Sequence, residues 1–210
     1  MQAAALAGTA TLPLVLIVSM VSDVTGSGGL NPGSSDAQLI RVFVEYRDQQ
    51  LVASSLYAAA AAATLLFLGP LWARLRTGSE WLAVVAVAGG VAAGFLWLLA
   101  SAWSMTAVVA ADYEDAGAAR FLMVSGWEIA RLSVAPHLVM VGAATVTGFR
   151  HGAFGRWFNV TGLGFTLLLA VGLVPFAPAG MMGMLATLWV FLASLVLAFG
   201  SPPETRPDAR

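Results

Sequence analysis

The sequence predicts an all-α integral membrane protein: a six-transmembrane-helix bundle with a short amphipathic helix on its outer side. Composition is the first reason. Of the 210 residues, 59% are hydrophobic and 10% are charged, and the mean hydropathy is +0.84. Soluble domains carry about a quarter charged residues, and a chain this apolar lacks the polar groups to cover its surface in water. The second reason is that the apolar residues fall into runs of about 20, the length that crosses a bilayer.

Six of these runs are expected to form a single transmembrane domain, residues 1–200, followed by a disordered cytoplasmic tail, residues 201–210. The first run has no preceding Arg or Lys, unlike a secretory signal, so we expect it to be retained; cleavage would leave five spans in the same orientation. Trp81 and Trp103 bracket the third run, about 33 Å apart on a helix, as aromatic residues do at the two membrane interfaces. The expected spans are 4–21, 51–72, 81–103, 130–149, 157–174 and 181–199.

Arginine sets the orientation, because the chain has no Lys and short cytoplasmic loops are rich in basic residues. In a six-span arrangement three arginine pairs fall on one side, which predicts a bacterial inner-membrane protein with both termini in the cytoplasm. Arg150, Arg156 and Trp157 would anchor the chain at the inner leaflet, and Gly152 between them permits a tight reversal. The three pairs are Arg74 and Arg76, Arg150 and Arg156, and Arg206 and Arg210.

Two segments are expected on the outer side. Ser35 and Gln38 have the spacing of a capping box. They precede an apolar stripe that predicts an amphipathic helix on the outer membrane surface, leading into the second span. The second segment is an acidic loop whose carboxylates could hold a calcium ion; without the spacing of a defined calcium loop, it is interpreted as solvated, and no metal is expected. The stripe contains Leu39, Ile40, Phe43 and Tyr46, and the loop contains Asp112, Glu114 and Asp115.

The stretch GWEIARLSVAPH, at the start of the fourth span, is the main candidate site, because charges in hydrocarbon are costly and usually functional. Measured along a helix from Arg150, Arg131 lies about 28 Å and Glu128 about 33 Å away, near the outer edge of a hydrocarbon core of about 30 Å. At i and i+3 the two side chains share a helix face. We interpret them as an interfacial anchor. The alternatives are part of an outward-facing binding pocket, or snorkelling at the lipid surface.

His137 differs from this pair because it lies about 20 Å from Arg150, inside the apolar zone. Pro136 before it removes a helical hydrogen bond and can open a polar niche. We expect a neutral imidazole that hydrogen-bonds a Ser, a Thr or a carbonyl on a neighbouring span. The alternative is a role in a proton relay or a ligand contact.

Several classes of protein function are excluded because the chain lacks the residues that they require. The absence of Cys excludes thiolate chemistry and Cys-ligated metals, and the absence of Lys excludes a P-loop and Schiff-base catalysis. Of the two His residues, His151 falls in a predicted cytoplasmic loop, so a bis-His haem within the bilayer is not expected, nor is another cofactor. A net charge of −1 argues against a nucleic-acid partner.

Gly90 and Gly94 form a GxxxG pattern in the third span, which allows helices to approach closely. Packing within the chain is the first interpretation. The alternative is a homodimer, or a contact with another membrane protein, through these glycines.

The inner loop RHGAFGRW, residues 150–157, resembles the Arg-x-Gly-x-x-Pro-Arg-Trp loop of an uncharacterised family of multi-pass membrane proteins from high-GC bacteria, known only as a domain of unknown function. The order of the other elements, from residue 36 to residue 199, is similar as well. Gly155 stands where the pattern has Pro, which bears on the rigidity of the loop. The resemblance implies a multi-pass architecture and no particular activity.

No nucleophile, metalloprotease or kinase signature is present, and we do not expect an enzyme. The sequence favours a non-enzymatic accessory or partner-binding subunit of the membrane. The alternative is a small-solute or lipid transporter with an outward-facing vestibule lined by Glu128, Arg131 and the acidic loop. A water-filled crevice that reaches His137 would favour the transporter, and a solidly packed bundle with a bare apolar lateral face would favour the accessory subunit.

Overall fold

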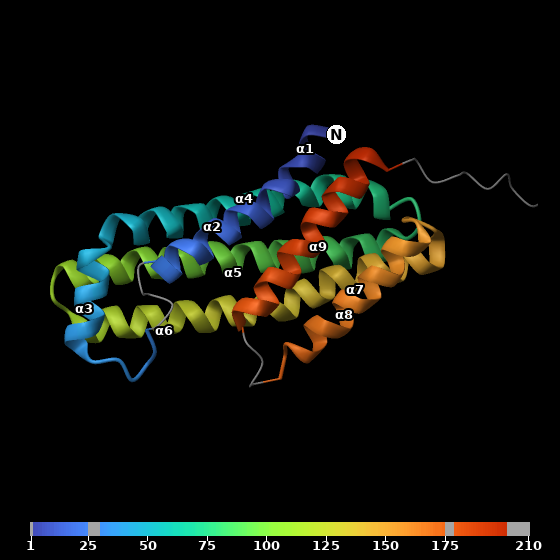
Figure 1. Cartoon of the computed structure of the whole chain (residues 1–210). Helices are drawn as coiled ribbons and strands as arrows, with labels where there is room; N and C mark the ends of the chain where they lie inside the picture. The colour runs from blue at the N-terminus through green and yellow to red at the C-terminus, as the bar shows by residue number, and fades with distance from the viewer. Residues whose placement is uncertain (1, 25–29, 175–178, 201–210) are drawn as a thin grey trace, which may run out of the picture.

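The computed structural model describes residues 2–24, 30–174 and 179–200, and the regular elements in these ranges are all helices. Figure 1 shows most of them running lengthwise in an elongated bundle. The expected tail, residues 201–210, lies outside the described residues. The helices are α1 (Gln2–Ala7), η1 (Gly8–Ala10), α2 (Thr11–Val24), α3 (Asp36–Glu45), α4 (Arg47–Leu75), α5 (Glu80–Asp112), α6 (Ala116–Leu132), α7 (Val134–His151), α8 (Arg156–Val171) and α9 (Ala179–Phe199).

Five helical segments are long and apolar enough to cross a membrane, by length and composition. The fold is therefore compatible with a helical membrane bundle. The expected span 157–174 corresponds to α8, which is apolar but has 16 residues and is shorter than the others. The five long segments are Ala3–Ser22, Arg47–Leu75, Glu80–Asp112, Ala116–His151 and Met181–Phe199.

Local sequence signals determine several helix ends. The predicted cap of α3 is confirmed, because the Ser35 side chain accepts a hydrogen bond from the Gln38 amide at 3.2 Å. Asp115 caps α6 in the same way, through the Ala118 amide. The tight reversal predicted at Gly152 is also confirmed, since this residue ends α7 with a φ of 67°, a conformation that favours glycine.

Helix α5 is the centre of the bundle and packs against α4, α6 and α7. Small residues bring its neighbours close. The backbone at Gly89 lies against Pro136 and Met140 of α7, while Gly90 and Gly94 are buried under the Leu68 and Leu65 side chains of α4. The GxxxG pattern is therefore used between helices of one chain.

Helix α3 lies across the ends of α4, α5 and α6 (Figure 1). The expected stripe exists, but it does not face outward. Leu39 and Phe43 are buried against α5 and α6, in a small core with Val108 and Met123. Packing on protein rather than on a membrane surface satisfies the apolar face of this helix, so α3 caps one end of the bundle.

The bundle is longer than the sequence suggested. Helix α5 has 33 residues, which is about 50 Å, and α6 with α7 forms a 36-residue segment of similar length. The expected acidic loop is reduced to a turn between Asp112 and Ala116, because α6 runs back along α5. Gly126 allows this approach beside Trp103, so the indole nitrogen of Trp103 is buried rather than at an open interface.

Candidate ligand-binding site

A cavity of about 680 Å³ lies inside the half of the bundle that α3 caps. Its walls come from α2, α4, α5 and α6, and Gly183 and Met184 near the start of α9 complete them. Leu30 and Phe43 close it on the α3 side. Small-molecule sites in proteins have volumes of about 300–1,000 Å³, so this cavity is large enough to hold a ligand.

The cavity is possible because fewer helices surround this half of the bundle. In Figure 1, α8 and α9 occupy the opposite half, and α2 reaches only part of the way toward α3. Small residues of α4 and α5, among them Ala53, Ala100 and Ser104, line the cavity and leave it unfilled. The space therefore follows from helix length and from small side chains on facing surfaces.

The floor of the cavity is a layer of aromatic rings. Tyr57 of α4 stacks on Trp97 of α5 with ring centroids 5.1 Å apart, and Trp97 contacts His137 of α7 at the same centroid distance. Tyr57 and Trp97 line the cavity, whereas His137 does not. Because the His137 side chain is 1% exposed, Trp97 separates it from the cavity.

A hydrogen bond fixes Trp97 to the junction between α6 and α7. Its indole nitrogen donates to the Ser133 hydroxyl at 2.9 Å, and that hydroxyl donates to the Ala130 carbonyl at 2.6 Å. The Ser133 carbonyl accepts from Nδ1 of His137 at 2.8 Å. Since a carbonyl can only accept, Nδ1 carries a proton. The expected hydrogen bond of His137 to another span is thus replaced by one within its own helical segment, one turn back.

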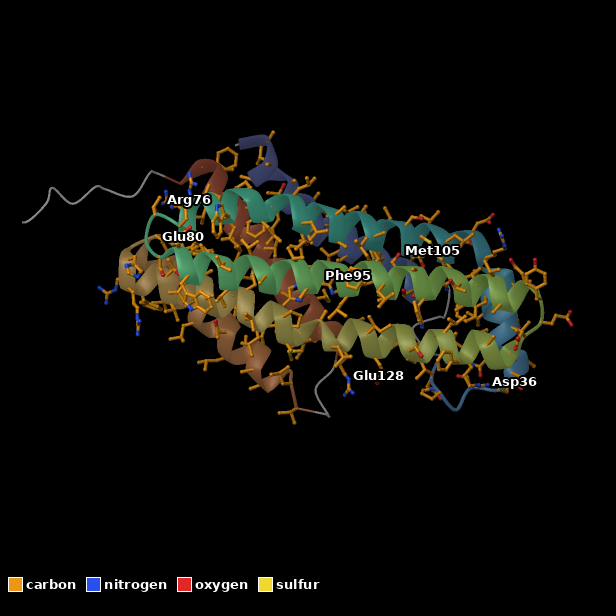
Figure 2. The ribbon with its side chains drawn as sticks, turned by 180° about the vertical axis from the view of Figure 1, so that it is seen from behind. Asp36, Arg76, Glu80, Phe95, Met105 and Glu128 are labelled. Atoms are coloured by element: carbon orange, nitrogen blue, oxygen red, sulfur yellow. The ribbon has the colours of Figure 1, made fainter. Side chains whose placement is uncertain are left out.

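Glu128 and Arg131 form the charged rim of the cavity. The guanidinium of Arg131 donates to the Glu128 carboxylate from Nη2 at 2.6 Å and from Nε at 2.9 Å. Both residues line the cavity, and their side chains are 54% and 40% exposed, respectively. Figure 2 shows Glu128 at the edge of α6. The pairing predicted from the i, i+3 spacing is present, and the structure places the pair at a cavity.

Hydroxyl groups continue the polar lining below the rim. Ser54, Ser101 and Ser104 all line the cavity. The Ser101 hydroxyl donates to the Ser54 carbonyl at 2.6 Å and so joins α5 to α4, while the Ser104 hydroxyl bonds within its own helix to the Ala100 carbonyl. The lining is thus apolar with several polar groups, as in sites that orient small ligands.

The outer acidic residues lie elsewhere. Asp112 pairs with Arg47 at 2.8 Å, Asp115 caps α6, and Glu114 lies in the turn between them with a φ of 57°. None of the three lines the cavity. Their role as part of a vestibule with Glu128 is therefore not supported, because the turn holds them at the end of α5.

The predicted inner anchors lie at the opposite end. Arg150, Arg156 and Trp157 are exposed there, Trp157 by 62%. Arg74, which the sequence suggested only as a topology signal, donates from Nε to the Ala153 carbonyl at 2.6 Å. This bond ties the loop after α7 to the end of α4.

Sequence reasoning missed Tyr57, Trp97 and Ser133. A signal was available for Trp97, because a Trp in the middle of an apolar run, away from the predicted interfaces, needs a partner for its indole nitrogen. Among the described residues, no three acidic or histidine side chains come together as metal ligands would. Comparisons with family models, curated proteins and solved structures find no match to this chain. The resemblance of the inner loop stays a prediction.

Proposed function

We propose that the chain is a six-span inner-membrane protein, with both termini in the cytoplasm, that binds a small amphiphilic molecule in an outward-facing cavity. The cavity is the observation that carries this proposal. It places a charged pair at the rim, hydroxyl groups below it and apolar walls around it. Of the two functions that the sequence leaves open, an accessory subunit and a small-solute or lipid transporter, the cavity supports the second against a solidly packed bundle. The cavity ends at Trp97, however, and does not reach His137.

The distribution of exposed side chains supports placement in a membrane. Phe95, midway along α5, is 62% exposed and lies on the rear face in Figure 2, and Leu66 and Leu167 are exposed to similar degrees. Of the labelled charged residues, Arg76 and Glu80 lie at one end and Asp36 at the other, while Glu128 lies between them on α6 (Figure 2). Such lateral apolar faces are costly in water and favourable in lipid.

Helix α8 is the sixth span in this proposal. Its 16 residues make about 24 Å, somewhat less than the hydrocarbon thickness, and a short span is accommodated by local thinning of the bilayer at modest cost. Reporter fusions after residues 77, 116 and 153 test the topology. Cytoplasmic signals are expected at 77 and 153 and an external signal at 116; the reverse at any of them would contradict the arrangement.

Binding rather than chemistry is supported by the state of the polar groups. The Glu128 carboxylate is engaged by Arg131, and His137 is enclosed behind Trp97. General acid–base catalysis needs a group within hydrogen-bond reach of the substrate, and His137 does not offer this because it does not line the cavity. The aromatic floor also closes the cavity on the cytoplasmic side, as in the outward-facing state of a carrier.

Filling the cavity tests the proposal. Ser104→Trp would place a large side chain in the cavity, because Ser104 lines it. Thr106→Trp is the matched control, since Thr106 lies two residues further along α5 on an exposed face. Native mass spectrometry of protein purified in mild detergent should find a bound small molecule on the wild type and on Thr106→Trp. Occupancy should fall about tenfold on Ser104→Trp. Equal occupancy in all three proteins would overturn the proposal.

A further inference from the structure

The charge content of the cavity limits what it can bind. Among the described residues that line it, Glu128 and Arg131 carry charge, one of each sign. They are in direct contact and partly exposed, so the charges that the described lining presents are of both signs and accessible. A ligand that binds here meets a carboxylate and a guanidinium together.

A ligand with a single charge fits this rim poorly. An anion on Arg131 would face the Glu128 carboxylate, and a cation on Glu128 would face the guanidinium, and like charges in a partly desolvated site repel strongly. A zwitterion avoids this cost, because its ammonium can approach Glu128 while its anionic group approaches Arg131. Each protein charge then keeps a partner of opposite sign, which a desolvated ion pair requires.

The walls of the cavity indicate what kind of group the zwitterionic part of the ligand is attached to. Val15 and Val18 of α2 and Met184 of α9 line the cavity with apolar atoms. Helix α2 packs on α4 and α9, and α6 packs on α5 and α3, so the cavity is bounded by α2 on one side and by α6 on the other. In Figure 1, α6 runs below α5, and α2 lies above α6 in the view. Apolar walls beside a charged rim suit an amphiphile rather than a free polar solute.

The expected depth of Glu128 and Arg131 in the membrane agrees with an amphiphilic ligand. Measured along α7 and α6 from Arg150, the charged pair lies about 28–33 Å away, close to the outer limit of a hydrocarbon core of about 30 Å. Headgroups of lipids in the outer leaflet lie at this level. A lipid could therefore enter sideways with its headgroup at the rim and its chains among apolar side chains.

We infer that the cavity binds a zwitterionic amphiphile of the ammonium–phosphate class, such as a phosphatidylethanolamine, with the ammonium on Glu128 and the phosphate on Arg131. This inference rests on the proposed function and specifies its ligand. The headgroup chemistry could also come from free phosphoethanolamine, but the apolar walls favour the lipid.

Native mass spectrometry of delipidated protein can test this with three probes: phosphatidylethanolamine, phosphatidylglycerol of the same chain length, and free phosphoethanolamine. Only the binding that Ser104→Trp removes is counted as binding in the cavity, because lipids on the outer surface of the protein stay bound to this variant. The wild type should prefer phosphatidylethanolamine over phosphatidylglycerol by about tenfold or more. Free phosphoethanolamine should bind far more weakly than the lipid.

Charge variants sharpen the test. Glu128→Gln removes the partner of the ammonium and leaves Arg131 for the phosphate, so the preference should shift toward phosphatidylglycerol by about tenfold. Glu45→Gln is the matched control, because Glu45 loses the same charge from an exposed pair with Arg41 on α3 and does not line the cavity. Its preference should equal that of the wild type.

The outcomes separate this inference from the proposed function. If the cavity binds both lipids equally well, or if Glu128→Gln leaves the preference unchanged, the zwitterion inference fails while the binding function stands. Free phosphoethanolamine binding as tightly as the lipid would overturn the lipid source. If none of the probes binds in a way that Ser104→Trp removes, and no other molecule co-purifies in the cavity, the proposed function itself fails.

Discussion

The two halves of the bundle are built differently. We name the halves after the proposed topology: the inner half contains α8, and the outer half is the one that α3 caps. The inner half is closed by buried aromatic side chains: Trp189 of α9 packs on Phe67 of α4 and on Phe158 of α8, with ring centroids 6.4 and 6.0 Å apart. The outer half is held together at its end by ion pairs between helices, such as Arg47 with Asp112, and Arg120 with Asp36 at 2.5 Å. Between these ends lies the cavity.

The two halves show where the fold tolerates unfilled space. Apolar close packing supplies most of the free energy of a core, and the inner half has helices on more sides to provide it (Figure 1). Exposed ion pairs add little stability. In the outer half they fix how the helix ends are aligned, while the space between the helices is not filled. The cavity lies in the half where packing is incomplete, next to a closely packed half.

The largest expected effect is in the inner half. Trp189→Ala should lower the free energy of unfolding by about 3–5 kcal/mol, because the side chain is 1% exposed and packs on Phe67 of α4 and Phe158 of α8. Trp189→Phe should cost much less, since the indole nitrogen has no hydrogen-bond partner to lose. Denaturant unfolding in detergent, followed by circular dichroism, measures both. A smaller loss for Trp189→Ala than for removal of a cavity-lining side chain would reverse the comparison.

An intermediate effect is expected at the floor of the cavity. Trp97→Phe and Ser133→Ala each remove the hydrogen bond between these residues, at about 1 kcal/mol. The double variant should cost less than the sum of the two, with a coupling of about 1 kcal/mol. Ser104→Ala combined with Trp97→Phe is the control and should be additive, because the Ser104 hydroxyl bonds to its own helix. Additivity in the first pair would show that the floor is not fixed by this bond.

The smallest effect is expected at the rim. A double-mutant cycle of Glu128→Gln and Arg131→Gln should give a coupling below about 1 kcal/mol, because both side chains are partly exposed. The coupling should decrease further with added salt. A coupling above about 2 kcal/mol that resists salt would mean that the rim is desolvated, and the cavity would then be closed rather than accessible.

Features encoded by neighbouring residues could be predicted from the sequence. The cap at Ser35, the stripe of α3 and the reversal at Gly152 depend on a few adjacent positions, and the structure has all three. The apolar runs likewise predicted the long helices. The pairing of Glu128 with Arg131 followed from helix geometry alone.

The cavity could not be predicted, because it depends on how helices end relative to one another. The acidic stretch after Asp112 was expected to be a loop. Instead, the cap at Asp115 starts α6 immediately, and α6 places Glu128 beside α5. Trp97 and Ser133 are 36 positions apart, and nothing local indicates that they meet. Long-range packing of this kind leaves only indirect traces in a single sequence, such as a Trp in the middle of an apolar run.

The segment from Ala116 to His151 has a mechanical consequence. Ser133 lies near its midpoint, and α6 and α7 extend from it by about 25 Å on either side. If the segment tilted as a rigid body, it would pivot at Ser133, the residue that Trp97 hydrogen-bonds. A tilt of about 5° at this point would displace each end by about 2 Å, in opposite directions. The acidic turn before Ala116 and the arginine-containing loop after His151 lie at the two ends that would move.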